Sequence, residues 1–135
     1  MSPVVEVVRT YLELRSPSQL RASHIDDPAV KFLRRANIGV DHYRRLYRAV
    51  GDRWLWTDRN AWPDTRLADY LARPSVSVWE CVVGDQTAGF FELEQEESGD
   101  VEIAYFGLVE KFIGRGLGKA MLTRAVEEAD RKSVV

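Results

Sequence analysis

Three glycines occupy alternate positions in one short stretch of the sequence, between a segment typical of a strand and a segment typical of a helix. They are Gly114, Gly116 and Gly118. Glycine leaves the backbone amides accessible and adopts φ angles that other residues resist. The following helix directs its first N–H groups and the positive end of its dipole toward this loop. The spacing predicts an anion site for a phosphate or pyrophosphate group; a plain turn that starts a helix is the alternative.

The two best-known phosphate loops do not match this stretch. A Walker A loop has four residues between its first glycine and Gly-Lys, followed by Ser or Thr. Here Gly114 and Gly118 enclose three residues, and Ala120 follows Lys119. The Rossmann fingerprint needs a two-residue gap before its last glycine, which this spacing lacks. The loop therefore belongs to neither class.

The composition is that of an ordinary folded protein. Its 135 residues are 45% hydrophobic and 30% charged, and 19 basic against 21 acidic residues give a net charge of −2. This balance predicts a real core and favours neither nucleic acid nor membrane as a partner. The single cysteine, Cys81, excludes an intrachain disulfide, and no metal site is expected. Since nothing resembles a signal peptide or a membrane span, we expect a cytoplasmic protein.

Hydrophobic periodicity predicts one domain over residues 1–135 in which strands and helices are mixed. The expected elements, in chain order, are a strand at 4–14, a loop or short helix at 18–30, a helix around 43–50 capped by Asp41 and stopped by Gly51, a helix from Pro63-Asp64 to a point before Pro74, strands at 76–83, 87–95 and 101–108, and a helix at 116–130. Short polar turns at 84–85 and 96–100 predict that the three consecutive strands form an antiparallel meander. Ser133-Val134-Val135 is either the start of another strand or a frayed helix end.

The run from Val101 to Leu122 resembles the acyl-CoA-binding core of the GNAT superfamily of N-acetyltransferases. The element order agrees as well: strand, two helices, three antiparallel strands, glycine loop, long helix. The family pattern in the loop is Arg or Gln, two residues, Gly, one residue, then Gly or Ala. Gly116 and Gly118 match the small positions, and Ile113 stands where Arg or Gln is usual.

This resemblance implies a mixed α/β fold, with a largely antiparallel sheet and flanking helices, that forms a single GNAT-like acyl-CoA-binding domain. Relative to the family pattern, the sequence ends early, before the C-terminal strands and helix. The implied activity is direct transfer of an acetyl group from acetyl-CoA, as co-substrate, to the primary amine of a small molecule or peptide. A catalytically inactive CoA-binding or regulatory module, or a fragment of an acetyltransferase, is the alternative. A homodimer is left open.

The resemblance also implies which residues bind acetyl-CoA. Main-chain groups of Phe106, Gly107 and Leu108 would meet the amides of the pantetheine arm, as if adding a strand. The backbone of the glycine loop would hold the pyrophosphate, and its residues are Ile113, Gly114, Arg115, Gly116, Leu117, Gly118 and Lys119.

Acetyl transfer to an amine requires a base, because the neutral amine is the nucleophile. Glu102 matches, without gaps up to the glycine loop, the glutamate that is the general base in histone-type members of the superfamily. In a regularly alternating strand, Glu102 shares a face with Ala104 and Phe106. The alternative is that Glu102 is an ordinary half-exposed strand carboxylate.

Glu92 is the second candidate for the base, together with Glu94 on the same strand. With the turn at 96–100 closing the hairpin, we expect these two carboxylates near Ile103 and Val101, on the face opposite Glu102. They would act as base through a water molecule, or would bind a cationic substrate.

The segment between the two predicted helices is dense in aromatic residues: Trp54, Trp56 and Trp62, with Tyr43, Tyr47 and Tyr70 on the flanking helices. In the superfamily this region shapes the acceptor site, where aromatic rings could contact a cationic amine. We expect most of these rings to anchor the helices in the core. The nearby arginines, Arg53, Arg59 and Arg66, are expected to be solvated; recognition of a carboxylate or phosphate is the alternative.

Overall fold

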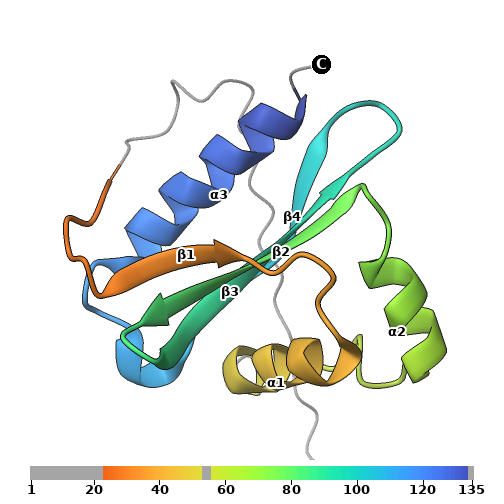
Figure 1. The fold of residues 1–135 in the computed structure, drawn as a ribbon, viewed down its shortest axis with the longest axis horizontal. Helices are drawn as coiled ribbons and strands as arrows, with labels where there is room; N and C mark the ends of the chain where they lie inside the picture. The colour runs from red at the N-terminus through yellow and green to blue at the C-terminus, as the bar shows by residue number, and fades with distance from the viewer. Residues whose placement is uncertain (1–22, 53–55, 134–135) are drawn as a thin grey trace, which may run out of the picture.

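The computed structural model describes residues 23–52 and 56–133. These residues form a four-stranded antiparallel sheet in the order β1-β2-β3-β4, with helices against it (Figure 1). The strands are β1 (Val30–Arg34), β2 (Val76–Val83), β3 (Gln86–Gln95) and β4 (Val101–Leu108), and the helices are α1 (Val40–Gly51), α2 (Asp64–Leu71) and α3 (Leu117–Ser133), with a short 3₁₀ turn at Glu110–Phe112. The predicted mixed α/β fold is confirmed.

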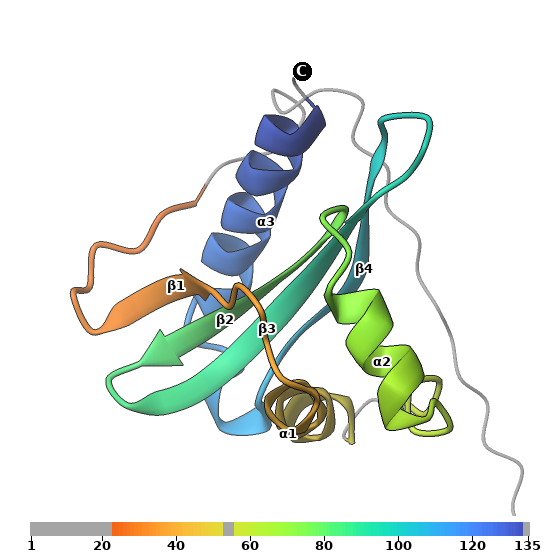
Figure 2. The same cartoon turned by 45° about the vertical axis from the view of Figure 1, so that its right-hand side comes forward.

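Different helices cover the two faces of the sheet. Helices α1 and α2 lie on one face, which we call the α1–α2 face, and helix α3 lies on the other, the α3 face (Figure 2). Side chains alternate along a strand, and β2 shows the result: Val76 and Val78 pack with α1 and α2, whereas Trp79 and Cys81 pack with α3. The sheet therefore separates two apolar cores.

The central and C-terminal elements agree closely with the sequence pattern. Strands β2, β3 and β4 form the expected meander, with Gly84 and Gly99 in its two turns at φ values of +63° and +93°. Helix α3 buries Leu117 and Met121, as its periodicity predicts. Ser133 is the last residue of this helix rather than the start of a strand.

The N-terminal part departs from the expectation. The strand expected at 4–14 lies outside the described residues. The sequence pattern does not predict strand β1, because Lys31 and Arg34 interrupt its apolar residues; it pairs only with β2 in the described chain, so it can carry charged side chains at an edge. Helix α1 begins after Gly39, and Asp41 lies in its first turn instead of capping it.

An extra residue interrupts the pairing of β3 with β4. Leu93 lies opposite Ile103, and Glu92 lies opposite Tyr105, so Ala104 has no counterpart on β3. This arrangement is a β-bulge, which shifts the alternation of side chains by one position. On one face of the sheet, β4 therefore presents even-numbered residues before the bulge and odd-numbered residues after it; on the other face the order is reversed.

Close packing of α1 on β4 explains Gly107. A Cβ at this position would lie 2.5 Å from Cγ1 of Val50. We expect Gly107→Ala to lower the free energy of unfolding by about 1–3 kcal/mol, the usual cost of overpacking a core, in urea denaturation. The matched variant Gly118→Ala should be neutral or stabilising, because its Cβ would meet Leu108 at an ordinary 3.7 Å within a helix. Equal stability of the two variants would contradict this explanation.

Candidate active site

The glycine loop adopts the backbone conformation that its sequence predicts. Gly114 and Gly116 have φ values of +86° and +81°, in the left-handed region that favours glycine. A Cβ at either position would meet no atom within 4 Å. These two glycines are therefore explained by backbone conformation and not by lack of space.

The amides of this loop are available to a ligand. The N–H of Ile113 donates to the carbonyl of Glu110, and the N–H of Ala120 lies 3.5 Å from the carbonyl of Gly116. Between them, the N–H groups of residues 114–119 donate to no backbone oxygen of the described chain. Unpaired amides at the positive end of a helix dipole form an anion site. The loop therefore fits a phosphate or pyrophosphate group.

Positive charge lies beside these amides, although not at the first position of the loop. Arg115 and Lys119 are both exposed. Ile113, at the position where the GNAT pattern usually has Arg or Gln, is 43% exposed and brings no charge. Binding of an anion would therefore depend on the backbone and on these two side chains.

Strand β4 leads directly to the loop, and one of its edges has no strand partner among residues 23–52 and 56–133. Among the described strands it pairs only with β3. Its last residue, Leu108, lies next to Gly118 at the start of α3. The structure thus brings the residues Phe106–Leu108 and the glycine loop together at one end of the sheet.

The register of the β3–β4 hairpin places the three candidate carboxylates on one face. Glu94 lies directly opposite Glu102, and Glu92 lies opposite Tyr105. The expectation that Glu92 and Glu94 lie on the face opposite Glu102, near Ile103 and Val101, is wrong. It assumed a hairpin register shifted by one residue. In the structure Gln95 pairs with Val101, so Glu94 lies opposite Glu102, and Glu92 shares the face of Glu94 because it is two residues away on the same strand.

The bulge at Ala104 changes the neighbours of Glu102 along β4. This side chain shares the α1–α2 face with Tyr105, whereas Phe106 packs against α3. Grouping Glu102 with Ala104 and Phe106 is therefore also wrong. Glu102 is exposed, Glu94 is half-buried and Glu92 is fully buried, so the three carboxylates differ strongly in their access to a substrate.

Glu92 accepts hydrogen bonds on both of its oxygens. The hydroxyl of Tyr43 donates to Oε1 at 2.6 Å. The hydroxyl of Tyr70 and Nη2 of Arg59 donate to Oε2 at 2.6 and 3.0 Å. Arg59 is itself only 8% exposed. Glu92 and Arg59 therefore form a buried ion pair that two tyrosines complete.

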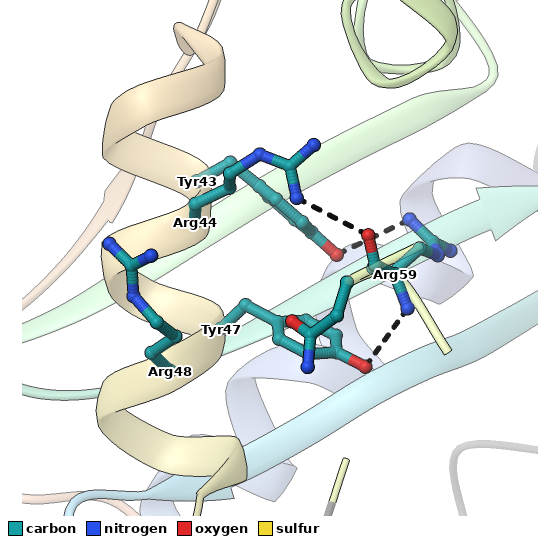
Figure 3. Close-up of a pocket in the computed structure, with 6 residues that line it drawn as sticks. Tyr43, Arg44, Tyr47, Arg48 and Arg59 are labelled. Atoms are coloured by element: carbon teal, nitrogen blue, oxygen red, sulfur yellow. Dashed lines mark hydrogen bonds between the residues drawn. The ribbon is translucent and has the colours of Figure 1, made fainter. Parts of the chain in front are cut away.

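Helix α1 holds the segment that carries Arg59 (Figure 3). The backbone N–H of Arg59 donates to the hydroxyl of Tyr47, and its Nη1 donates to the hydroxyl of Tyr43. Its carbonyl accepts from Nη1 of Arg44 at 3.3 Å. A cavity of about 20 Å³ lies among these groups, enough for about one water molecule.

The network fixes the charge states of its members. Burial raises the pKa of Tyr43 and of Tyr70, and the carboxylate of Glu92 raises both further. Burial alone would lower the pKa of Arg59, but the interactions with Glu92, Tyr43 and Tyr70 together outweigh it, so the guanidinium pKa is raised. Both tyrosines therefore remain neutral donors and Arg59 remains a cation.

Sequence reasoning placed the aromatic residues correctly and missed Arg59. Trp56 contacts the rings of Tyr47 and Tyr105, at centroid distances of 5.7 and 4.9 Å; Trp54 lies outside the described residues. The guanidinium of Arg59 lies 4.4 Å from the ring centroid of Trp62. The signal that points to Arg59 is its position in an aromatic-rich loop, since aromatic faces attract guanidinium groups.

Other chemistry is not evident in the described chain. Burial, followed by the charge of Glu80, raises the pKa of Cys81 to about 11, so this thiol stays protonated. Among the described residues, no group of three His, Cys, Asp or Glu side chains could hold a metal ion. The helices of that part of the chain include none that is long and apolar enough to cross a membrane.

An antiparallel sheet that leads through an amide-rich glycine loop into a helix is the fold class of acyl-CoA N-acyltransferases. A family model described as the acetyltransferase (GNAT) family matches residues 43–134. The chain belongs to the GNAT acetyltransferase family, whose members are N-acetyltransferases and generally use acetyl-CoA. No curated protein matches the chain.

Solved structures of acetyltransferases share this fold. An aminoglycoside acetyltransferase from an uncultured soil metagenomic sample, in complex with trehalose, has a TM-score of 0.64 and 14% identity, with 78% of this chain and 73% of that chain covered. The same enzyme in complex with sisomicin has a TM-score of 0.63, 14% identity and coverages of 78% and 72%. An IAA acetyltransferase from Bacillus cereus ATCC 14579 has a TM-score of 0.55 and 20% identity, with 76% of this chain and 59% of that chain covered.

Proposed function

We propose that this protein binds acetyl-CoA and transfers the acetyl group directly to a primary amine, with residues 1–135 acting as one acyl-CoA-binding domain. The observation that carries the proposal is the loop at 114–119: within the described part of the chain its amides have no backbone partner, and they lie beside the edge of β4 that no described strand covers. The loop offers an anion site for the pyrophosphate, and the edge of β4 offers main-chain partners for the amide-bearing arm.

The loop and β4 would bind different parts of acetyl-CoA. The backbone of Ile113–Lys119 would hold the pyrophosphate, helped by the side chains of Arg115 and Lys119. Main-chain groups of Phe106–Leu108 would hold the pantetheine arm along the same edge of β4. Acetyl-CoA, when bound, supplies a thioester as the acetyl donor.

Glu102 is the best-placed base for the acceptor amine. It is exposed, lies two residues before the bulge and shares its face with Tyr105. Its carboxylate would accept a proton from the acceptor ammonium ion, so that the neutral amine attacks the thioester carbon. The C–S bond then breaks, and CoA leaves as a thiolate that takes up the second proton lost by the nitrogen. Glu92 has no exposed surface and accepts three hydrogen bonds. We therefore assign Glu92 to holding Arg59 in place and assign proton transfer to Glu102.

The acceptor would enter on the α1–α2 face, where acidic and aromatic side chains lie together. Glu94 lies opposite Glu102, and the hydroxyl of Tyr105 lies 3.5 Å from Oδ2 of Asp58. Carboxylates beside aromatic rings suit an amine that arrives as an ammonium ion. A neighbour of the same fold, described as an aminoglycoside acetyltransferase in complex with sisomicin, is consistent with this proposal.

Calorimetric titration with acetyl-CoA tests the proposal. Gly116→Glu places a negative charge among the loop amides and a side chain at φ +81°, so we expect the Kd to rise at least about 100-fold, equivalent to about 2.8 kcal/mol. Gly99→Glu is the matched control: Gly99 has a φ of +93° and open space, but lies in the β3–β4 turn. It should leave the Kd unchanged.

One alternative is a module that binds acetyl-CoA without catalysis. The departure from the GNAT pattern at Ile113, an exposed side chain that brings no charge to the loop, favours this alternative. Acyl transfer to a panel of amines separates the two functions. Turnover that is lost in Gly116→Glu supports the enzyme, and binding without turnover of any amine supports the module. If the wild-type chain is folded and does not bind acetyl-CoA, both are ruled out for this chain.

A further inference from the structure

A second pocket lies apart from the glycine loop, beside the start of β2. Its volume is about 130 Å³, well above the roughly 10–15 Å³ that one water molecule needs. The residues that line it come from the end of β1, the loop at 35–38, the C-terminal end of α2 with the residues after it, and the start of β2; none comes from β4 or α3. The pocket is therefore separate from the proposed acetyl-CoA site.

The lining of this pocket is positively charged. Arg34, Arg35 and Arg73 all line it, and no acidic residue does. Nε of Arg35 donates to Oε1 of Glu80 at 2.9 Å, so the charge of Arg35 is largely offset. Within the described residues, neither Arg34 nor Arg73 forms an ion pair. Two arginines without an ion pair in that part of the chain therefore border one pocket: Arg73, after α2, and Arg34, which lies opposite Trp79 and so directs its side chain toward the α3 face.

The backbone adds a hydrogen-bond donor. The carbonyl of Val78 accepts from the N–H of Arg35, and a strand residue directs its N–H and C=O to the same side. The Val78 N–H therefore lies on the side where β1 has ended, and in the described part of the chain it donates to no backbone oxygen. Apolar side chains, Ile38 and Leu71 among them, complete the lining.

We infer that this pocket binds a small organic anion, in which a carboxylate or phosphate group is carried on a short apolar body. Guanidinium groups bind such oxyanions through paired N–H donors. The guanidinium of Arg73 lies 5.6 Å from the ring centroid of Tyr70, a contact that holds it near the C-terminal end of α2. The apolar lining residues would contact the carbon atoms of the ligand.

Amide NMR with two probes, inorganic phosphate and succinate, tests this inference on the full chain. We expect saturable shifts at the amides around Asn37 and Val78 in the wild-type protein. The double variant Arg34→Gln/Arg73→Gln should raise the Kd for the bound probe at least about tenfold. Arg45→Gln, an exposed arginine of α1, removes one charge outside the pocket lining and should leave the Kd unchanged.

Each other outcome is decisive as well. Shifts confined to residues 113–119 mean that the probes bind only the glycine loop, and they overturn the inference. An unchanged Kd in the double variant, or no shift with either probe, also overturns it. A preference for phosphate or for succinate identifies which oxyanion the pocket selects. Repeating the titration in Gly116→Glu shows that the result does not depend on the proposed acetyl-CoA site.

Discussion

Replacing Glu102 with glutamine is expected to lower kcat/KM for the amine by about 10²- to 10⁴-fold, the usual contribution of a positioned general base. The substitution keeps the size of this exposed side chain and removes only its ability to accept a proton. The Kd for acetyl-CoA should therefore stay unchanged. Steady-state kinetics with an active amine, together with calorimetry, check both expectations.

The pH dependence distinguishes a base from a merely structural carboxylate. As the pH rises toward the pKa of the acceptor amine, more of the amine loses its proton to solvent, so the deficit of Glu102→Gln should shrink. Glu97→Gln, in the exposed β3–β4 turn, is the matched control and should retain full activity. A Glu102→Gln enzyme with unchanged kcat/KM across pH would remove Glu102 from the mechanism.

Glu92→Gln is expected to act on stability, with a loss of about 3–5 kcal/mol in the free energy of unfolding. The substitution leaves the guanidinium of Arg59 buried without its anionic partner, which in the wild-type protein lies 3.0 Å away. It also replaces one carboxylate oxygen, a hydrogen-bond acceptor, with an amide NH₂ group, which can only donate and therefore faces other donors. Urea denaturation at neutral pH measures the loss.

Two further variants show whether the buried pair is the cause. Glu94→Gln changes the neighbouring carboxylate on the same strand, which is half-buried and contacts the hydroxyl of Tyr70, and should cost less than about 1 kcal/mol. The double variant Glu92→Gln/Arg59→Met should recover part of the loss, because the stranded charge is gone. A stable Glu92→Gln protein without activity would instead assign the base to Glu92.

The parts of the fold with strong local patterns could be predicted from the sequence. Alternating apolar residues and short polar turns define the β2–β3–β4 meander, and the alternate glycines define a loop with two positive φ values. Each pattern depends on residues close together in the chain. The candidate anion site could therefore be located from the order of the amino acids alone.

The features that depend on distant partners could not be predicted. The bulge at Ala104 results from the pairing of two strands, and the residues on either side of it, Ile103 and Tyr105, are ordinary strand formers. Arg59 is buried because Glu92 and Tyr43, 33 and 16 residues away, meet it in space. Strand β1 could not be predicted because charged residues interrupt its apolar pattern. Its position as an edge strand depends on its pairing with β2.

The separation of the two cores by the sheet has a consequence for how such a protein can diversify. The proposed acetyl-CoA loop is anchored by Leu117 and Phe112 on the α3 face, whereas the proposed acceptor side is built on the α1–α2 face around Tyr43 and Arg59. Substitutions that reshape one core need not disturb packing in the other. Selection could then exchange one amine for another while the donor stays the same.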